Sequence, residues 1–118
     1  MKAEVPTIVA SIQSLNQTGA FSATLFTPSS SGLFRISEYL EASPATPFTV
    51  PVMYTDDLGS QTVGGSGQFQ SVDPINNVAA AGFSVLVRVK AGQPITSATG
   101  GPPAGVTYNV YYVVEDMN

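Results

Sequence analysis

The segment Gly105–Glu115, GVTYNVYYVVE, carries the clearest strand pattern in the sequence. Its residues alternate with a period of two, which sends successive side chains to opposite faces of a strand. One face holds Val106, Tyr108, Val110, Tyr112 and Val114. β-Branched and aromatic residues suit a pleated surface that is half-buried. A strand with one apolar face needs neighbouring strands and a second layer over it, and the segment therefore predicts a layered β fold.

Further strands are predicted along the rest of the chain. Phe83–Lys90 alternates most regularly after the C-terminal segment, with Phe83, Val85, Val87 and Val89 on one face. Shorter strands are predicted at Thr7–Ile12, Phe21–Thr27, Leu33–Glu41, Phe48–Thr55 and Ile95–Thr99. Loops rich in Gly, Pro and Ser separate them. The pattern predicts an all-β fold: an antiparallel β-sandwich, jelly-roll-like, of seven to eight short strands.

Two residues conflict locally with this prediction. Glu38 falls on the apolar face of Leu33–Glu41, so it needs a partner such as Arg35 or Arg88, or an edge position that faces water. A helix is the rival interpretation of this segment, but its β-rich neighbours favour a strand. Pro51 cannot donate to a strand ladder, so Phe48–Thr55 is expected at a sheet edge or with a bulge.

Length and composition limit the function classes. The 118 residues fit a single domain, 1–118, and the chain has no cysteine and no histidine. Only 10% of residues are charged, against about 25% in ordinary soluble domains. A net charge of -4 with four basic residues argues against nucleic acid and anionic membranes as partners. No apolar run is long enough to span a membrane, and no signal peptide is recognised.

The N-terminal part allows two interpretations. Residues 1–30 hold only two charges, Lys2 and Glu4. The predicted strands in this region either belong to the sandwich, or residues 1–26 form an extended arm that lies on a neighbouring subunit. In the second case Ile8 and Ile12 are candidate contact residues.

No motif in the sequence indicates catalysis or a cofactor. Asp56-Asp57 with Gly59 offers oxygen ligands for calcium, but no further acids follow at ligand spacing, so an ordinary turn is favoured. A glycosidase pair with Glu38 or Glu41 has no specific support. The Gly-rich run Gly64–Gly67 lacks the residues of a phosphate-binding loop. We therefore expect no enzyme, no metal and no cofactor.

Candidate contact residues are polar or aromatic positions on strands. Tyr108 and Tyr112 share the apolar face and are predicted in the core, whereas Tyr111 lies on the opposite face and is the better contact. We expect the basic residues to form cross-strand ion pairs with acidic residues. The basic residues are Arg35, Arg88 and Lys90, and the acidic partners are Glu38, Glu41 or Glu115. The contact candidates are Tyr111, Arg35, Arg88, Ile8 and Ile12.

Four segments carry a resemblance to a known group of proteins. They are Ser29–Tyr39, Tyr54–Gly59, Val87–Thr96 and Tyr108–Glu115. In this order they resemble small β-sandwich structural proteins of tailed phages and prophages. They are also similar to the trimeric jelly-roll heads of the complement and tumour-necrosis type.

The resemblance implies a non-enzymatic virion component of the decoration (cement), fibre-head or tail type. Such a protein would act as a homo-oligomer, expected to be a trimer, against copies of itself and a major capsid or tail protein. It would be found in the virion after assembly in the bacterial cytoplasm. The alternative is an extracellular module that binds carbohydrate or a cell surface through Tyr111 and the loops around Ser29, Gly65 and Gly101.

Overall fold

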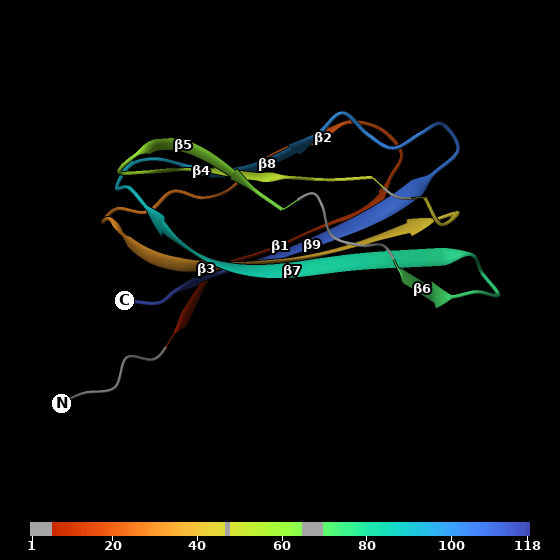
Figure 1. The fold of residues 1–118 in the computed structure, drawn as a ribbon, viewed down its shortest axis with the longest axis horizontal. Coiled ribbons are helices and arrows are strands. Elements are labelled where there is room, and N and C mark those ends of the chain that lie inside the picture. The colour runs from red at the N-terminus through yellow and green to blue at the C-terminus, as the bar shows by residue number, and fades with distance from the viewer. Residues whose placement is uncertain (1–5, 47, 65–69) are drawn as a thin grey trace.

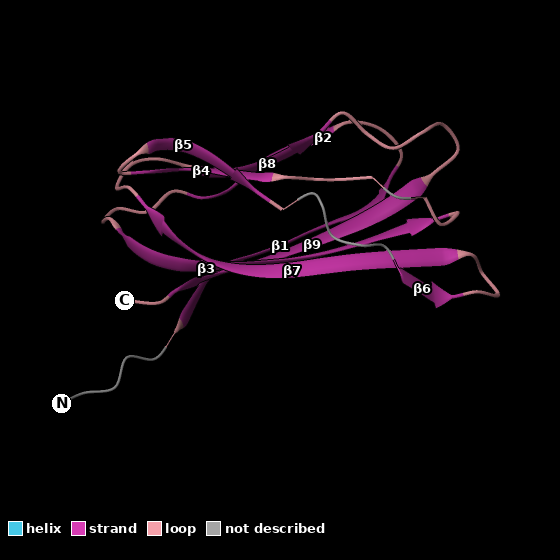
Figure 2. Ribbon diagram, in the orientation of Figure 1, coloured by secondary structure: helices cyan, strands magenta, loops and turns pink. Residues whose placement is uncertain are grey.

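The computed structural model describes residues 6–46, 48–64 and 70–118, which form two facing antiparallel sheets (Figure 1). The predicted all-β sandwich is confirmed, and Figure 2 shows only strands and loops in the described part. Nothing in these three ranges is a helix able to cross a membrane. The strands are β1 (Thr7–Gln17), β2 (Phe21–Phe26), β3 (Gly32–Ser43), β4 (Val52–Asp56), β5 (Gly59–Val63), β6 (Gln70–Asp73), β7 (Val78–Val89), β8 (Ile95–Thr99) and β9 (Thr107–Asp116).

The described residues form nine strands rather than the predicted seven to eight. The two short strands β5 and β6 lie at the ends of the Gly-rich segment, where the hydrophobic alternation is too weak to predict them. The five-stranded sheet has the order β1-β9-β3-β7-β6, and the four-stranded sheet has the order β2-β8-β4-β5. The chain crosses between the sheets at most connections, so strands distant in sequence become neighbours.

The core lies between the sheets and is built from the alternating residues that the sequence indicates. The predicted inner face of β9 is buried throughout, with Val110 and Val114 fully inaccessible. β3 is a strand and not a helix, and its residues Phe34, Ile36 and Leu40 are buried on the same side. The register aligns Ile36 with Val114 and Leu40 with Val110, so β3 and β9 form one continuous apolar surface.

The N-terminal strands belong to the sandwich in the isolated chain. β1 pairs with β9 in the five-stranded sheet, and β2 pairs with β8 in the four-stranded sheet. The ladder of β1 is irregular between Ser14 and Gln17, where Asn16 has a φ of 56°, and the chain then turns to the other sheet. Residues 7–26 are therefore paired within their own chain, while residues 1–5 lie outside the described residues.

Pro51 does not place its strand at an edge. β4 begins one residue later, at Val52, and lies between β8 and β5 with no register shift in either ladder. The expected edge position or bulge is therefore wrong. Because the paired strand starts at Val52, no hydrogen bond of the strand ladder requires the N–H group that Pro51 lacks. The Pro51 carbonyl instead accepts hydrogen bonds from the Ala98 amide at 3.4 Å and the Ser97 hydroxyl at 3.0 Å.

Two isoleucines test this assignment of the core. Ile36 has no exposed surface, whereas Ile8 is 63% exposed. Ile36→Ala should lower the free energy of unfolding by about 2–5 kcal/mol because it removes buried methyl groups and leaves a cavity. Ile8→Ala should change it by less than about 0.5 kcal/mol in urea denaturation of the same samples. Equal losses in the two variants would contradict the assigned core.

Candidate interaction surface

The outer face of the five-stranded sheet points away from the four-stranded sheet and carries most of the predicted contact residues. The β3–β9 register aligns Arg35 with Glu115, Tyr39 with Tyr111, and Glu41 with Asn109. Directly opposed side chains in an antiparallel pair lie close enough to interact. The outer face is therefore a set of cross-strand pairs.

These pairs neutralise most of the charge in the centre of this face. The Arg35 guanidinium donates two hydrogen bonds to the Glu115 carboxylate, at 2.9 and 3.0 Å. This hydrogen bonding holds the pKa of Glu115 below its usual value. The Glu41 carboxylate accepts from Asn109 Nδ2 at 2.9 Å and from the Tyr111 hydroxyl at 3.1 Å. Exposed ion pairs stabilise by only about 0–1 kcal/mol, so their main effect is to fix side-chain positions.

Large apolar side chains are exposed around these pairs. Ile8, Leu33, Tyr39 and Leu86 are all substantially exposed. The registers place Ile8 beside Glu115 and Leu86 beside Arg35, in one row across four strands. The Tyr39 ring packs against Tyr111, with centroids 6.0 Å apart. The face thus combines apolar patches with paired charges, as surfaces of protein–protein contacts do.

The structure brings together four of the five predicted contact residues. Tyr111, Arg35, Arg88 and Ile8 lie on the outer face, although Tyr111 is half-buried. Ile12 does not join them, because it aligns with Tyr112 and packs against the core.

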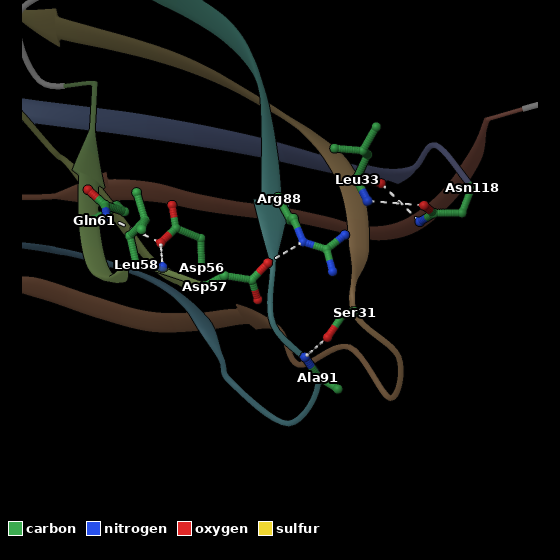
Figure 3. A network of polar contacts seen from close by, with 9 residues as sticks. All are labelled: Ser31, Leu33, Asp56, Asp57, Leu58, Gln61, Arg88, Ala91 and Asn118. Carbon is green, nitrogen blue, oxygen red and sulfur yellow. Dashed lines mark hydrogen bonds and ion pairs between the residues drawn. The ribbon is translucent and has the colours of Figure 1, made fainter.

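The predicted cross-strand ion pairs are only partly correct. Arg35 pairs with Glu115 as expected. Arg88 instead donates to Asp57 Oδ2 at 2.8 Å, because the end of β7 lies close to the β4–β5 turn (Figure 3). An acid in a turn cannot be assigned to a strand partner from alternation alone.

Asp56 and Asp57 form a turn, as the sequence favours. Asp56 Oδ1 accepts hydrogen bonds from the Leu58 amide at 2.8 Å and from Gln61 Nε2 at 3.3 Å (Figure 3). Gly59 follows with a φ of 122°, a conformation that favours glycine. Over the described ranges no three acidic side chains gather in a way that could hold a metal ion.

The loops of the carbohydrate-binding alternative do not form one site. The loop after β2, which includes Ser29, contacts the β7–β8 loop: Ser31 Oγ accepts from the Ala91 amide at 2.8 Å (Figure 3). Gly101 follows β8. Because β2 and β8 are antiparallel, the segments that follow them lie at opposite ends of the sheet. Gly65 lies outside the described residues.

A buried polar chain crosses the core beneath this face. Glu38 lies on the inner face of the central strand β3 and is only 7% exposed. Its carboxyl group lies next to the Tyr112 hydroxyl. Tyr112 in turn bonds to Ser97 Oγ at 2.5 Å, and Ser97 donates to the Pro51 carbonyl at 3.0 Å. The chain therefore joins the two sheets.

The expected partner or edge position of Glu38 is wrong. Arg35 and Arg88 point to the outer face, on the other side of the sheet from Glu38, as the alternation along β3 requires. One carboxyl oxygen, Oε2, is buried and has no hydrogen-bond partner within the described structure. A buried carboxylate without a counter-charge is costly, so the group is expected to hold its proton.

The hydrogen-bond count supports a protonated Glu38. The Pro51 carbonyl can only accept a hydrogen bond, so the Ser97 hydroxyl donates its proton to that carbonyl. Tyr112 must then donate to Ser97, which leaves the Tyr112 oxygen as an acceptor for a proton from Glu38. An ionised Glu38 would draw the Tyr112 proton to itself and leave the Tyr112–Ser97 contact without a donor. Burial raises the pKa of Glu38 to about 8, in agreement with this count.

Comparison with known proteins gives a fold and no family. No protein-family model matches the sequence, and no curated protein matches it significantly. The structure is similar to two crystal structures of a pentameric capsid protein isolated from metagenomic phage sequences. The first matches with a TM-score of 0.52 and 13% identity, and the second, solved by iodide phasing, with 0.53 and 12%.

The likeness covers nearly the whole chain. It includes 93% of this chain and 63% of each capsid protein chain, so this chain spans less than two thirds of their length. The chain shares the fold of these capsid proteins. The resemblance found in the sequence, to small phage β-sandwich proteins, agrees with this result.

Glu38 should make stability depend on pH. The folded chain keeps this proton up to about pH 8, whereas the unfolded chain loses it near 4.5, the ordinary pKa. The folded state binds more protons between these values, so the free energy of unfolding falls as pH rises from about 4.5 to about 8. A shift of this size corresponds to about 4–5 kcal/mol. Glu38→Gln cannot ionise, and it should match the wild type near pH 4.5 and be clearly more stable at pH 8.

Urea denaturation at a series of pH values measures this difference. Glu115→Gln, on the outer face of the neighbouring strand β9, is the control and should keep the wild-type slope between pH 5 and 8, because its pairing with Arg35 lowers the pKa of Glu115. The pKa values of Asp73 and Glu115 are lowered in the folded chain, so their protonation changes the free energy of unfolding only at pH values below this range. Parallel pH profiles for Glu38→Gln and the wild type would contradict a protonated, buried Glu38.

Proposed function

We propose that this protein is a non-enzymatic structural component of a phage particle that works through contacts with copies of itself. The observation that carries the proposal is the shared fold over 93% of the chain with pentameric phage capsid proteins. The sequence identity is only 12–13%, so the proposed role also rests on the strand order and on the low charge of the surface.

The strand order supports the proposal. Without β6, the two sheets have four strands each, in the orders β1-β9-β3-β7 and β2-β8-β4-β5. The chain passes from one sheet to the other at most connections, and the only hairpin between neighbouring strands of this set is β4–β5. We infer that this is a double-sheet jelly roll, an architecture used in viral capsid domains.

The surface also supports subunit contacts. The whole chain has only twelve charged residues, and on the outer face Arg35 and Glu115 neutralise each other. Surfaces that are buried between subunits are depleted in charge at their centre because burying an unpaired charge is costly. A low-charge surface with exposed Ile8, Tyr39 and Leu86 fits a protein that is covered by its neighbours.

The oligomer is proposed to be a closed ring. The sequence leads to an expected trimer, but the similar solved proteins are pentameric, so we favour five copies. Their description as capsid proteins favours a shell role over a decoration, fibre or tail role. On this proposal the protein is located in the virion, after assembly in the bacterial cytoplasm, and its other partner is a capsid protein.

Native mass spectrometry of the purified chain tests the proposal. At micromolar concentration the wild type should appear as a closed oligomer, five times the 12.2 kDa chain mass. Because the contacts carry little charge, light scattering should give the same mass at low salt and at about 1 M salt, where charge interactions are screened beyond about 3 Å. A 12.2 kDa monomer at all concentrations would contradict self-assembly.

A further inference from the structure

One flank of the sandwich is free of charge. Residues 5–34 contain no Asp, Glu, Lys or Arg. This stretch forms β1, the edge of the five-stranded sheet, and β2, the edge of the four-stranded sheet. The two strands contact each other, so both edges lie on the same side of the molecule. We call β1 and β2 together the uncharged flank.

Both edges of this flank are open to further pairing. β1 pairs only with β9, and β2 only with β8, in the ladders of the described residues. Monomeric proteins usually protect sheet edges with charged residues, prolines or very short strands. β1 has eleven residues and β2 has six, and neither contains a charge or a proline. The usual protection against pairing with another chain is missing here.

The opposite flank is protected. β6 has only four residues, and it ends at Asp73, directly before Pro74. β5 has five residues, and the turn before it carries the Asp57–Arg88 ion pair. The difference between the two flanks is therefore a specific feature of this chain and does not follow from its low overall charge.

Apolar side chains on the uncharged flank are only partly covered. Ile12 and Phe21 pack against the core but remain half-exposed. Ile8 and Leu15 on β1 are exposed, by 63% and 44%. A strand added beside these edges would satisfy free backbone groups and cover apolar surface together, which is how sheet edges bind an extended segment.

We propose that the uncharged flank is the surface through which one copy of this chain binds a second copy. This inference rests on the proposed function and adds the contact surface. A partner recognised by charge would find nothing to pair with between residues 5 and 34. Another copy can bury this surface without desolvating any charge by presenting a different uncharged surface to it, as the head-to-tail contacts of a ring require.

Matched lysine variants test the flank. Ser11 on β1 and Ser22 on β2 are exposed, and so are Ser60 on β5 and Gln93 in the β7–β8 loop. Ser11→Lys/Ser22→Lys should give a folded monomer at concentrations where the wild type assembles, with at least a tenfold higher dissociation constant. Ser60→Lys/Gln93→Lys has the same net charge and should assemble as the wild type does. Circular dichroism checks the fold of both variants, and native mass gives the oligomer.

The outcomes separate the two proposals. If the wild type and both variants assemble equally, the flank is not the contact surface, and the proposed structural role stands. If the wild type itself is monomeric, both the flank contact and self-assembly are overturned. If only the control variant loses assembly, the contact lies on another face and the flank proposal fails.

Thiol labelling gives a second measurement that does not depend on adding charge. Because the chain has no cysteine, Ser22→Cys and Ser60→Cys each introduce a single thiol. In the oligomer, maleimide should react with Ser22→Cys at least tenfold more slowly than in the dilute monomer, and with Ser60→Cys at an unchanged rate. Equal rates for Ser22→Cys in both states would overturn the proposal.

Discussion

The position of β9 between β1 and β3 is the constraint on which the rest of the structure depends. β9 pairs along its length with both strands, so it joins the N-terminal strand to the centre of the five-stranded sheet. Its inner side chains reach across the core: Tyr112 bonds to Ser97 of the other sheet, and the Tyr108 hydroxyl donates to the Gly19 carbonyl at 2.7 Å. The same strand therefore sets the sheet order, holds the two layers together and fixes the turn between β1 and β2.

The buried polar chain connects this core to the proposed contact surface. Phe21 of the uncharged flank stacks on the ring of Tyr112, with ring centroids 6.4 Å apart, and the hydroxyl group of the same tyrosine bonds to Ser97. A neutral Glu38 completes the hydrogen bonds of this chain, whereas its ionisation would place an unpaired charge in the core.

Much of the fold follows from alternation in the sequence, and much of the site does not. The buried faces of β3 and β9, the turn at Asp57-Leu58 and the Arg35–Glu115 pair are all predictable, because each depends on neighbours within a strand or on a simple register. The same alternation places Arg35 and Glu38 on opposite faces of β3, which excludes Arg35 as the partner of Glu38. The Tyr112–Ser97 contact could not be predicted, since it depends on how two sheets stack. The lack of charge near the N-terminus is plain in the sequence, yet only the topology shows that it forms two edges of one flank.

The proposed structural role requires a surface that favours copies of the same chain, and we propose the uncharged flank, at the side where both sheets end, as that surface. Amide hydrogen exchange of the wild-type chain, compared between the dilute and the assembled state, tests this claim most directly. The account predicts slower exchange on assembly at amides of Thr7–Gln17 and Phe21–Phe26, because new strand pairing would protect them. Unchanged exchange in both strands, with protection elsewhere or nowhere, would contradict it.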